Sequence, residues 1–276
     1  MSGNSELAAG LAALYRRYNR RSFVHPDPLE LVHEHEDSRD QEIVGLVSAC
    51  LAYGRVAQIL ASVRRALAAL SGPDHDAADA SPRAALLAAS DATIRRRLAG
   101  FRHRFTTDAE LSSLFIGVRH AIRDHGSLEA LFRAGVAPDD RTILSALTRF
   151  VSRLRDYAGG RNASASLLSS PEDGSACKRL NLYLRWMVRR DAVDPGPWTT
   201  ISRSLLVVPL DTHLFRLSRA LGLTRRNQPN LATALEITAG FARISPRDPV
   251  RYDFALTRLG INPACTDEDI RRLLIP

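Results

Sequence analysis

A single lysine is the residue of this chain with the most specific chemical potential. Of the 38 lysine and arginine residues in 276 positions, only Lys178 is a lysine. Arginine has replaced lysine wherever a positive charge alone was needed, so the remaining lysine suggests a chemical role. A lysine amine with a lowered pKa can form a Schiff base, whereas arginine cannot release its proton and attack carbon. Lys178 is therefore a candidate nucleophile; the alternative is a solvated surface lysine that escaped replacement by chance.

A carboxylate after the lysine is the second candidate for chemistry. Asp211 follows an apolar run that ends in Pro209, and apolar residues at helical spacing come directly after it, at Leu214, Leu217 and Leu221. This pattern predicts that Asp211 is the N-cap of a helix, a role in which aspartate contributes about 1 kcal/mol and needs no other function.

The elements that must position these two residues are predicted to be helices. Strand alternation bounded by turns is hard to find, whereas apolar residues recur at helical spacing, as in Ile43, Val44, Val47 and Leu51, and in Leu180, Leu184, Met187 and Val188. We predict an all-α protein. A break from Ala158 to Gly174, with glycines, serines and Pro171, separates an N-terminal helical half from the half that carries Lys178.

Composition favours a polyanionic partner. The net charge is +8 and the pI about 10.1, and an arginine-rich surface supplies sequence-independent affinity for nucleic acid. The three cysteines have no CxxC spacing, so we expect no disulfide framework, structural zinc or iron–sulfur cluster: Cys50, Cys177 and Cys265. Without an apolar run of membrane-spanning length or a signal-peptide pattern at the start, we expect no membrane partner and a cytoplasmic, nucleoid-associated protein.

The segment around Asp211 closely resembles a known motif. Pro-Leu-Asp211-Thr-His-Leu-Phe-Arg216, followed by Leu-Gly-Leu223, resembles the catalytic-aspartate segment of the helix-hairpin-helix DNA glycosylases. Endonuclease III-like members differ, because they have a shorter lysine-to-aspartate interval and a Gly-x-Gly hairpin that this chain lacks. The archaeal-type 8-oxoguanine glycosylases are more similar: some have a longer interval, and others have Phe-Leu-Arg where this chain has Tyr183-Leu-Arg185.

A second resemblance covers nearly the whole chain and is to a widespread bacterial family of unknown function. It is carried by Tyr15-x-x-Tyr-Asn19, Asp40-Gln-Glu-Ile43, Ala52-Tyr-Gly-Arg55, Phe101-Arg-His-Arg-Phe105, Gly126-Ser-Leu-Glu129 and Cys177-Lys-Arg-Leu-Asn181. This family implies no activity.

The glycosylase resemblance implies a fold and separate catalytic roles for Lys178 and Asp211. We expect one all-α domain over residues 1–276, with two helical lobes and a cleft that holds an extruded base. Asp211 would stabilise the oxocarbenium-like sugar, and the amine of Lys178 would attack its anomeric carbon. Flipping a base out of the duplex costs a few kcal/mol, which protein contacts must offset. The candidates for those contacts are Tyr53, Arg55, Arg179, Tyr183, Arg185, Trp186, Trp198, His213 and Phe215, although aromatic side chains on helices more often belong to the core.

A metal site is the weaker interpretation of a third cluster. His33-Glu-His-Glu-Asp37 has metal-like residue types, but the two histidines are two apart and no third ligand has a suitable spacing, so a solvated loop explains the residues. We expect no metal and no cofactor. Asp40 and Glu42 precede an apolar helix and are interpreted as charges at its N-terminus. Tyr53 and Arg55, at the other end of that helix, are consistent with either a helix end or a pocket lining.

The sequence and the glycosylase resemblance thus favour a monomeric DNA glycosylase with AP-lyase activity that acts on duplex DNA, and the resemblance implies an 8-oxoguanine-like purine as the base. Two alternatives come from other classes. One is a DNA-binding or scaffold protein that keeps the fold without catalysis, and the other is an N-glycosidase of modified nucleosides, for which a basic surface is unnecessary. The identity of the base does not follow from sequence, since pocket shape is assembled from distant residues.

Overall fold

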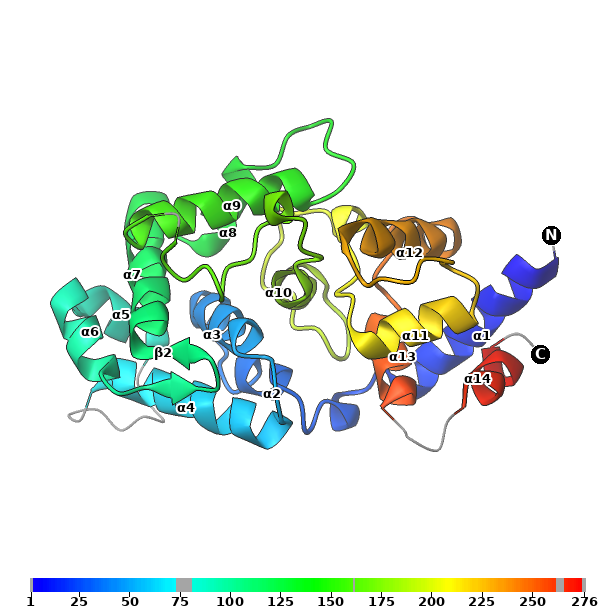
Figure 1. Ribbon diagram of the computed structural model, residues 1–276, viewed down its shortest axis with the longest axis horizontal. Helices are drawn as coiled ribbons and strands as arrows, with labels where there is room; N and C mark the ends of the chain where they lie inside the picture. The colour runs from blue at the N-terminus through cyan, green and yellow to red at the C-terminus, as the bar shows by residue number, and fades with distance from the viewer. Residues whose placement is uncertain (1, 73–80, 161, 262–265, 275–276) are drawn as a thin grey trace.

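The computed structural model describes residues 2–72, 81–160, 162–261 and 266–274, and the fold is helical almost throughout (Figure 1). Within these residues the only strands are β1 (Arg102–His103) and β2 (Thr106–Thr107), which pair antiparallel as a short hairpin. The all-α prediction is confirmed.

One group of helices, on the left of Figure 1, comes from residues 29–157. Helix α7 packs against α6, α8 and α9, and α3 packs against α2, α4 and α5. The bounds are α2 (Leu29–Val32), α3 (Ser38–Cys50), α4 (Val56–Ser71), α5 (Pro82–Ala88), α6 (Asp91–Leu98), α7 (Asp108–His125), α8 (Leu128–Ala134) and α9 (Leu144–Tyr157).

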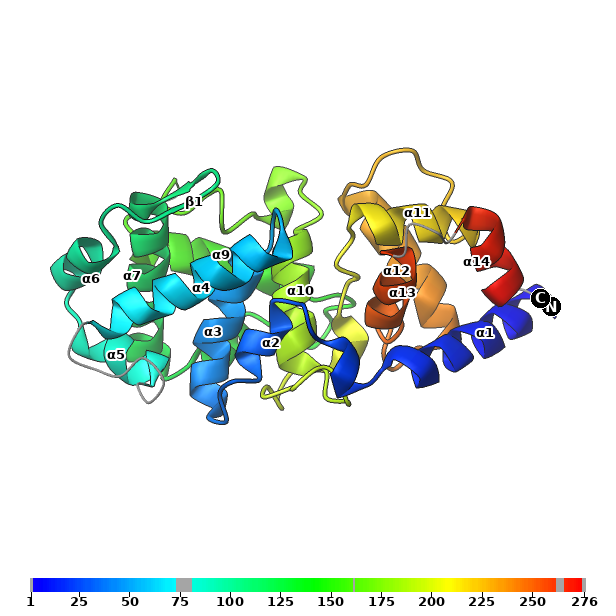
Figure 2. The same cartoon turned by 90° about the horizontal axis from the view of Figure 1, so that it is seen from below.

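A second group, on the right of Figure 1, combines the first helix with the last four. Helix α1 packs against α13 and α14, and α11 packs against the same two helices, so both ends of the chain lie in this group (Figures 1 and 2). The bounds are α1 (Ser2–Tyr18), α11 (Thr212–Ala220), α12 (Leu231–Ile244), α13 (Asp253–Gly260) and α14 (Asp267–Leu274). Among the described residues, three 3-10 turns lie in the connections: η1 (Arg21–Phe23), η2 (Pro171–Asp173) and η3 (Arg203–Leu205).

Helix α10 (Lys178–Val188) stands between the two groups and is seen end-on in Figure 1. It packs on α3, where a Cβ added at Gly45 would lie 2.8 Å from the flexible end of the Met187 side chain. Buried apolar side chains of both groups and of α10 form one continuous core. The helix that carries the candidate lysine is therefore anchored along its length.

Two carboxylates on α3 hold the beginnings of other helices. Asp40 accepts hydrogen bonds from the Ser81 hydroxyl (2.7 Å) and the Arg83 amide (2.8 Å) at the start of α5. Glu42 accepts from the amides of Leu128 (3.0 Å) and Glu129 (3.1 Å) at the start of α8. Asp40 does lie in the first turn of α3. The interpretation of Glu42 as a charge serving its own helix was wrong, because its carboxylate satisfies the free amides of α8 instead.

Candidate functional site

Lys178 is the first residue of α10, and its side chain is exposed. Cys177, the N-cap, has a left-handed backbone (φ 47°) and offers no side-chain cap. The helix begins there because the Asn181 amide donates to the Cys177 carbonyl (2.8 Å), while the Asn181 side chain donates to Ala176 (3.0 Å). The amine therefore stands in solvent beside the positive end of the α10 dipole, a position that favours an anionic group of a ligand.

Arg179 and Tyr53 contact each other next to Lys178 and connect three segments. Arg179 donates to the carbonyls of Cys50 (2.6 Å) and Ser166, and its guanidinium lies over the Tyr53 ring, 5.3 Å from the centroid. The Tyr53 hydroxyl donates to the His103 carbonyl (2.9 Å). These two candidates thus tie the end of α3 to the start of α10 and to the hairpin. Both are partly buried, so each retains some surface beside Lys178.

Asp211 is the N-cap of α11, as the sequence predicted. Its carboxylate accepts a hydrogen bond from the Leu214 amide (2.7 Å), and the side chain is half-buried. His213 is exposed on the first turn. Phe215 packs partly against the core, and the Arg219 guanidinium lies 5.9 Å from its ring centroid. The start of α11 therefore presents one carboxylate and one imidazole to solvent.

Asp211 lies within electrostatic range of Asp253 on α13, which pairs with Arg185 on α10. Residues seven apart lie on the same face of a helix, so Lys178 and Arg185 share one. Arg185 pairs with Asp253 on α13, and with Asp194 at 3.1 Å. Burial raises the pKa of Asp253 to about 6; Arg185 opposes this rise, and the nearby carboxylate of Asp211 adds to it. The negative charge of Asp211 thus raises the pKa of Asp253, one of the two carboxylates that pair with Arg185.

The raised pKa of Asp253 predicts a pH-dependent stability. The folded protein keeps this proton up to about pH 6, whereas an ordinary aspartate has a pKa near 3.8. The unfolded state therefore binds fewer protons in this window, and the stability that Asp253 contributes falls as the pH rises from about 4 to 6, by about 3 kcal/mol at most. Asp253→Asn should flatten this part of the pH profile in urea unfolding. The exposed Asp139→Asn is the control, and parallel profiles for Asp253→Asn and wild type would contradict the assignment.

Four other candidates are buried, and we correct their expected contact with substrate. Trp186 is 0% and Trp198 2% exposed, and the Trp198 indole N–H donates to Glu42 (3.0 Å). Arg185 is 3% exposed and is held by two aspartates. Tyr183, on the same helix, is also buried. Side chains enclosed in this way position α10 and do not stack on a ligand.

The exposed aromatic that sequence reasoning missed lies at the tip of the hairpin. Phe105 is 77% exposed, and the Arg104 guanidinium lies 5.5 Å from its ring centroid. The Arg104 side chain also covers Gly54, whose φ of 101° favours glycine; a Cβ there would lie 2.9 Å from it. Arg55, next in the chain, is exposed and is the N-cap of α4. The sequence feature that indicates this exposed aromatic is the pair Arg104-Phe105, which forms the turn between β1 and β2.

The histidine cluster near residue 33 has a structural contact. The His33 ring bonds to the Val193 carbonyl (2.7 Å), and Glu34 pairs with Arg64 (2.6 Å). Across the described ranges, no three His, Cys, Asp or Glu side chains are arranged to hold a metal ion.

Cys50 and Cys177 are buried free thiols, and Cys265 lies outside the described residues. No helix that the structure describes has the length and apolar character to cross a membrane.

Comparison with known proteins shows which family the chain belongs to. No curated protein and no solved structure is significantly similar to this chain. A family model with the description "Protein of unknown function (DUF2400)" matches residues 27–262, which include α2 to α13 and both candidate residues. Because this match covers most of the sequence, the chain belongs to the DUF2400 family.

Proposed function

We propose that this protein is a DNA glycosylase with AP-lyase activity, in the manner of the helix-hairpin-helix enzymes. The observation that carries the proposal is the position of the only lysine. Lys178 stands exposed at the first position of α10, and Asp211, within the glycosylase-like segment, caps α11 with a half-buried carboxylate. A nucleophilic amine and a carboxylate are the two groups that glycosidic cleavage through a lysine imine uses.

In the proposed reaction, the neutral amine of Lys178 attacks C1′ of the sugar. The bond between C1′ and the base nitrogen breaks, and the base leaves with the bonding electrons and takes up a proton. The carboxylate of Asp211 stabilises the positive charge that develops on the sugar. The ring then opens to an imine between Lys178 and C1′. Loss of a C2′ proton breaks the C3′–O bond and expels the 5′-phosphate of the downstream strand, and water hydrolyses the imine.

The surface beside Lys178 supports DNA as the substrate. Arg55 and Arg104 are exposed near the start of α10 and can contact phosphates, which supply most of the sequence-independent affinity. Phe105 projects from the same hairpin and has the exposure that the buried tryptophans lack. In this proposal the Phe105 ring fills the gap that the extruded base leaves in the base stack. Stacking of the ring on the neighbouring bases then offsets part of the free energy that flipping costs.

The test is strand cleavage of duplexes that each contain one altered site: 8-oxoguanine, uracil or an abasic site. We expect wild-type protein to cleave the 8-oxoguanine duplex. Asp211→Asn should reduce turnover on the order of 100-fold or more, because the negative charge opposite the cation is lost. Binding should survive better than turnover, since asparagine is also a good N-cap.

Two results would overturn the proposal. Duplex binding that weakens with salt, without cleavage of any of these duplexes, would indicate a non-catalytic DNA-binding protein. Release of a base from free modified nucleosides, without affinity for duplex DNA, would indicate a nucleoside N-glycosidase.

A further inference from the structure

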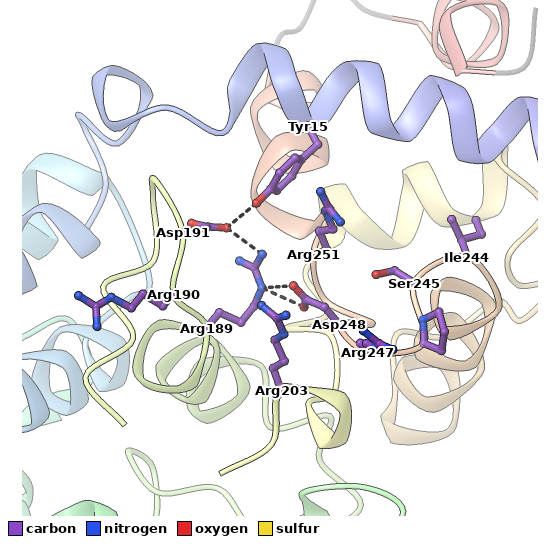
Figure 3. Close-up of a pocket in the computed structure, with 11 residues that line it drawn as sticks. Tyr15, Arg189, Arg190, Asp191, Arg203, Ile244, Ser245, Arg247, Asp248 and Arg251 are labelled. Carbon is purple, nitrogen blue, oxygen red and sulfur yellow. Dashed lines mark hydrogen bonds and ion pairs between the residues drawn. The ribbon is translucent and has the colours of Figure 1, made fainter. Parts of the chain in front are cut away.

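A basic cavity lies at the other end of α10 from Lys178, about 16 Å along the helix axis (Figure 3). Its volume is about 460 Å³, within the usual range for small-molecule sites. Four segments line it: α1, the residues after α10, η3, and the connection from α12 to α13. The lining contains two aspartates and five arginines: Arg189, Arg190, Arg203, Arg247 and Arg251.

The two aspartates are already engaged by one buried arginine. Arg189, 3% exposed, donates to Asp248 (3.0 Å and 3.1 Å) and to Asp191 (2.8 Å), and also pairs with the fully buried Asp194. Tyr15 on α1 points at Asp191 and donates to it at 2.9 Å (Figure 3). Burial and Asp191 raise the pKa of Tyr15 to about 12, so its hydroxyl stays protonated. The two carboxylates that line the cavity are thus already paired with Arg189 and Tyr15.

The remaining arginines leave an excess of positive charge. Arg203 and Arg247 are exposed, and neither side chain forms an ion pair or hydrogen bond with any residue that the structure describes. Arg203 rises from η3 toward the Arg189–Asp248 pair, whereas Arg190 points away from it (Figure 3). Arg251 lies over the Tyr15 ring, 4.5 Å from its centroid, which fixes its position. Guanidinium groups from separate segments therefore line one cavity, and the aspartates beside them are already paired with Arg189.

We propose that this cavity binds the phosphate group of a phosphorylated ligand. Guanidinium groups match phosphate oxygens in geometry as well as charge, and an anion at this position would offset the repulsion among Arg203, Arg247 and Arg251. The volume also leaves room for a second phosphate or an attached group. The site lies at the opposite end of α10 from the candidate nucleophile and does not depend on the glycosylase proposal.

The experiment measures binding of inorganic pyrophosphate to the full chain by calorimetry and by thermal shift, with sodium chloride matched for ionic strength. We expect pyrophosphate to raise the Tm of the wild-type protein. The double variant Arg203→Ala/Arg247→Ala should bind at least tenfold more weakly. Both residues are exposed, so the fold should be retained, and circular dichroism checks this. The control is Arg95→Ala/Arg96→Ala, which removes two exposed arginines from α6 and should leave binding unchanged.

Two arms identify the source of the phosphate. A mononucleotide that binds wild type tightly, together with unchanged duplex affinity in the double variant, would support a free phosphorylated ligand. Duplex DNA that competes with pyrophosphate and loses affinity in the double variant would support a backbone phosphate at the same site. The proposal is overturned if pyrophosphate does not bind the wild type, or if both double variants bind it equally well.

Discussion

Lys178→Arg is expected to abolish covalent trapping of the protein on an abasic duplex by borohydride. An arginine keeps the positive charge at the start of α10 but cannot form the imine that borohydride reduces to a stable amine. The substitution changes an exposed side chain at the first helical position, so the fold should be unaffected. The measurement is the yield of the protein–DNA adduct on a denaturing gel, compared with wild type at equal duplex occupancy.

The control separates this lysine from other amines. The N-terminal amine can also form an imine with an abasic sugar, so a weak adduct in wild type is insufficient evidence. Lys178→Arg/Arg95→Lys restores one exposed lysine, on α6, far from α10 in Figure 1. We expect this variant to remain inactive, because the amine must be positioned on the sugar. Undiminished trapping in Lys178→Arg would show that the lone lysine is an accident of composition.

Local signals were sufficient to predict the beginnings of the two candidate helices. Asp211 is the N-cap of α11, and Arg179 and Arg185 lie on the helix that Lys178 begins, as expected. N-cap chemistry and apolar spacing extend over only one or two turns, so they can be interpreted without knowledge of the tertiary fold. The prediction that the protein is all-α rests on the same short-range pattern.

The candidates that became structural depend on partners far away in the sequence. Trp198 donates to Glu42, 156 residues earlier, and Arg185 pairs with Asp253, 68 residues later. Periodicity indicates that a side chain lies on one face of a helix, but it does not indicate what covers that face. The same limit applies to Phe105, whose exposure depends on how the hairpin projects from the surrounding helices.

Glu42→Ala is expected to lower the free energy of unfolding by about 3 to 5 kcal/mol, because it leaves buried donors without an acceptor. The Glu42 carboxylate is 1% exposed and accepts from Leu128, Glu129, Trp198 and Arg39. Burial raises its pKa, and these four donors oppose that rise. Urea unfolding, followed by circular dichroism and by tryptophan fluorescence, measures the loss.

Two comparisons separate this network from surface charge. Glu34→Ala removes a glutamate whose pair with Arg64 is about half exposed, and it should cost about 1 kcal/mol or less. Glu42→Gln keeps the shape and one acceptor oxygen but loses the charge, so its stability should lie between those of Glu42→Ala and wild type. If Glu42→Ala were no less stable than Glu34→Ala, the start of α8 and the Trp198 segment would not be held by this carboxylate. The assignment of Trp198 to the core rather than to a substrate contact would then lose its energetic basis.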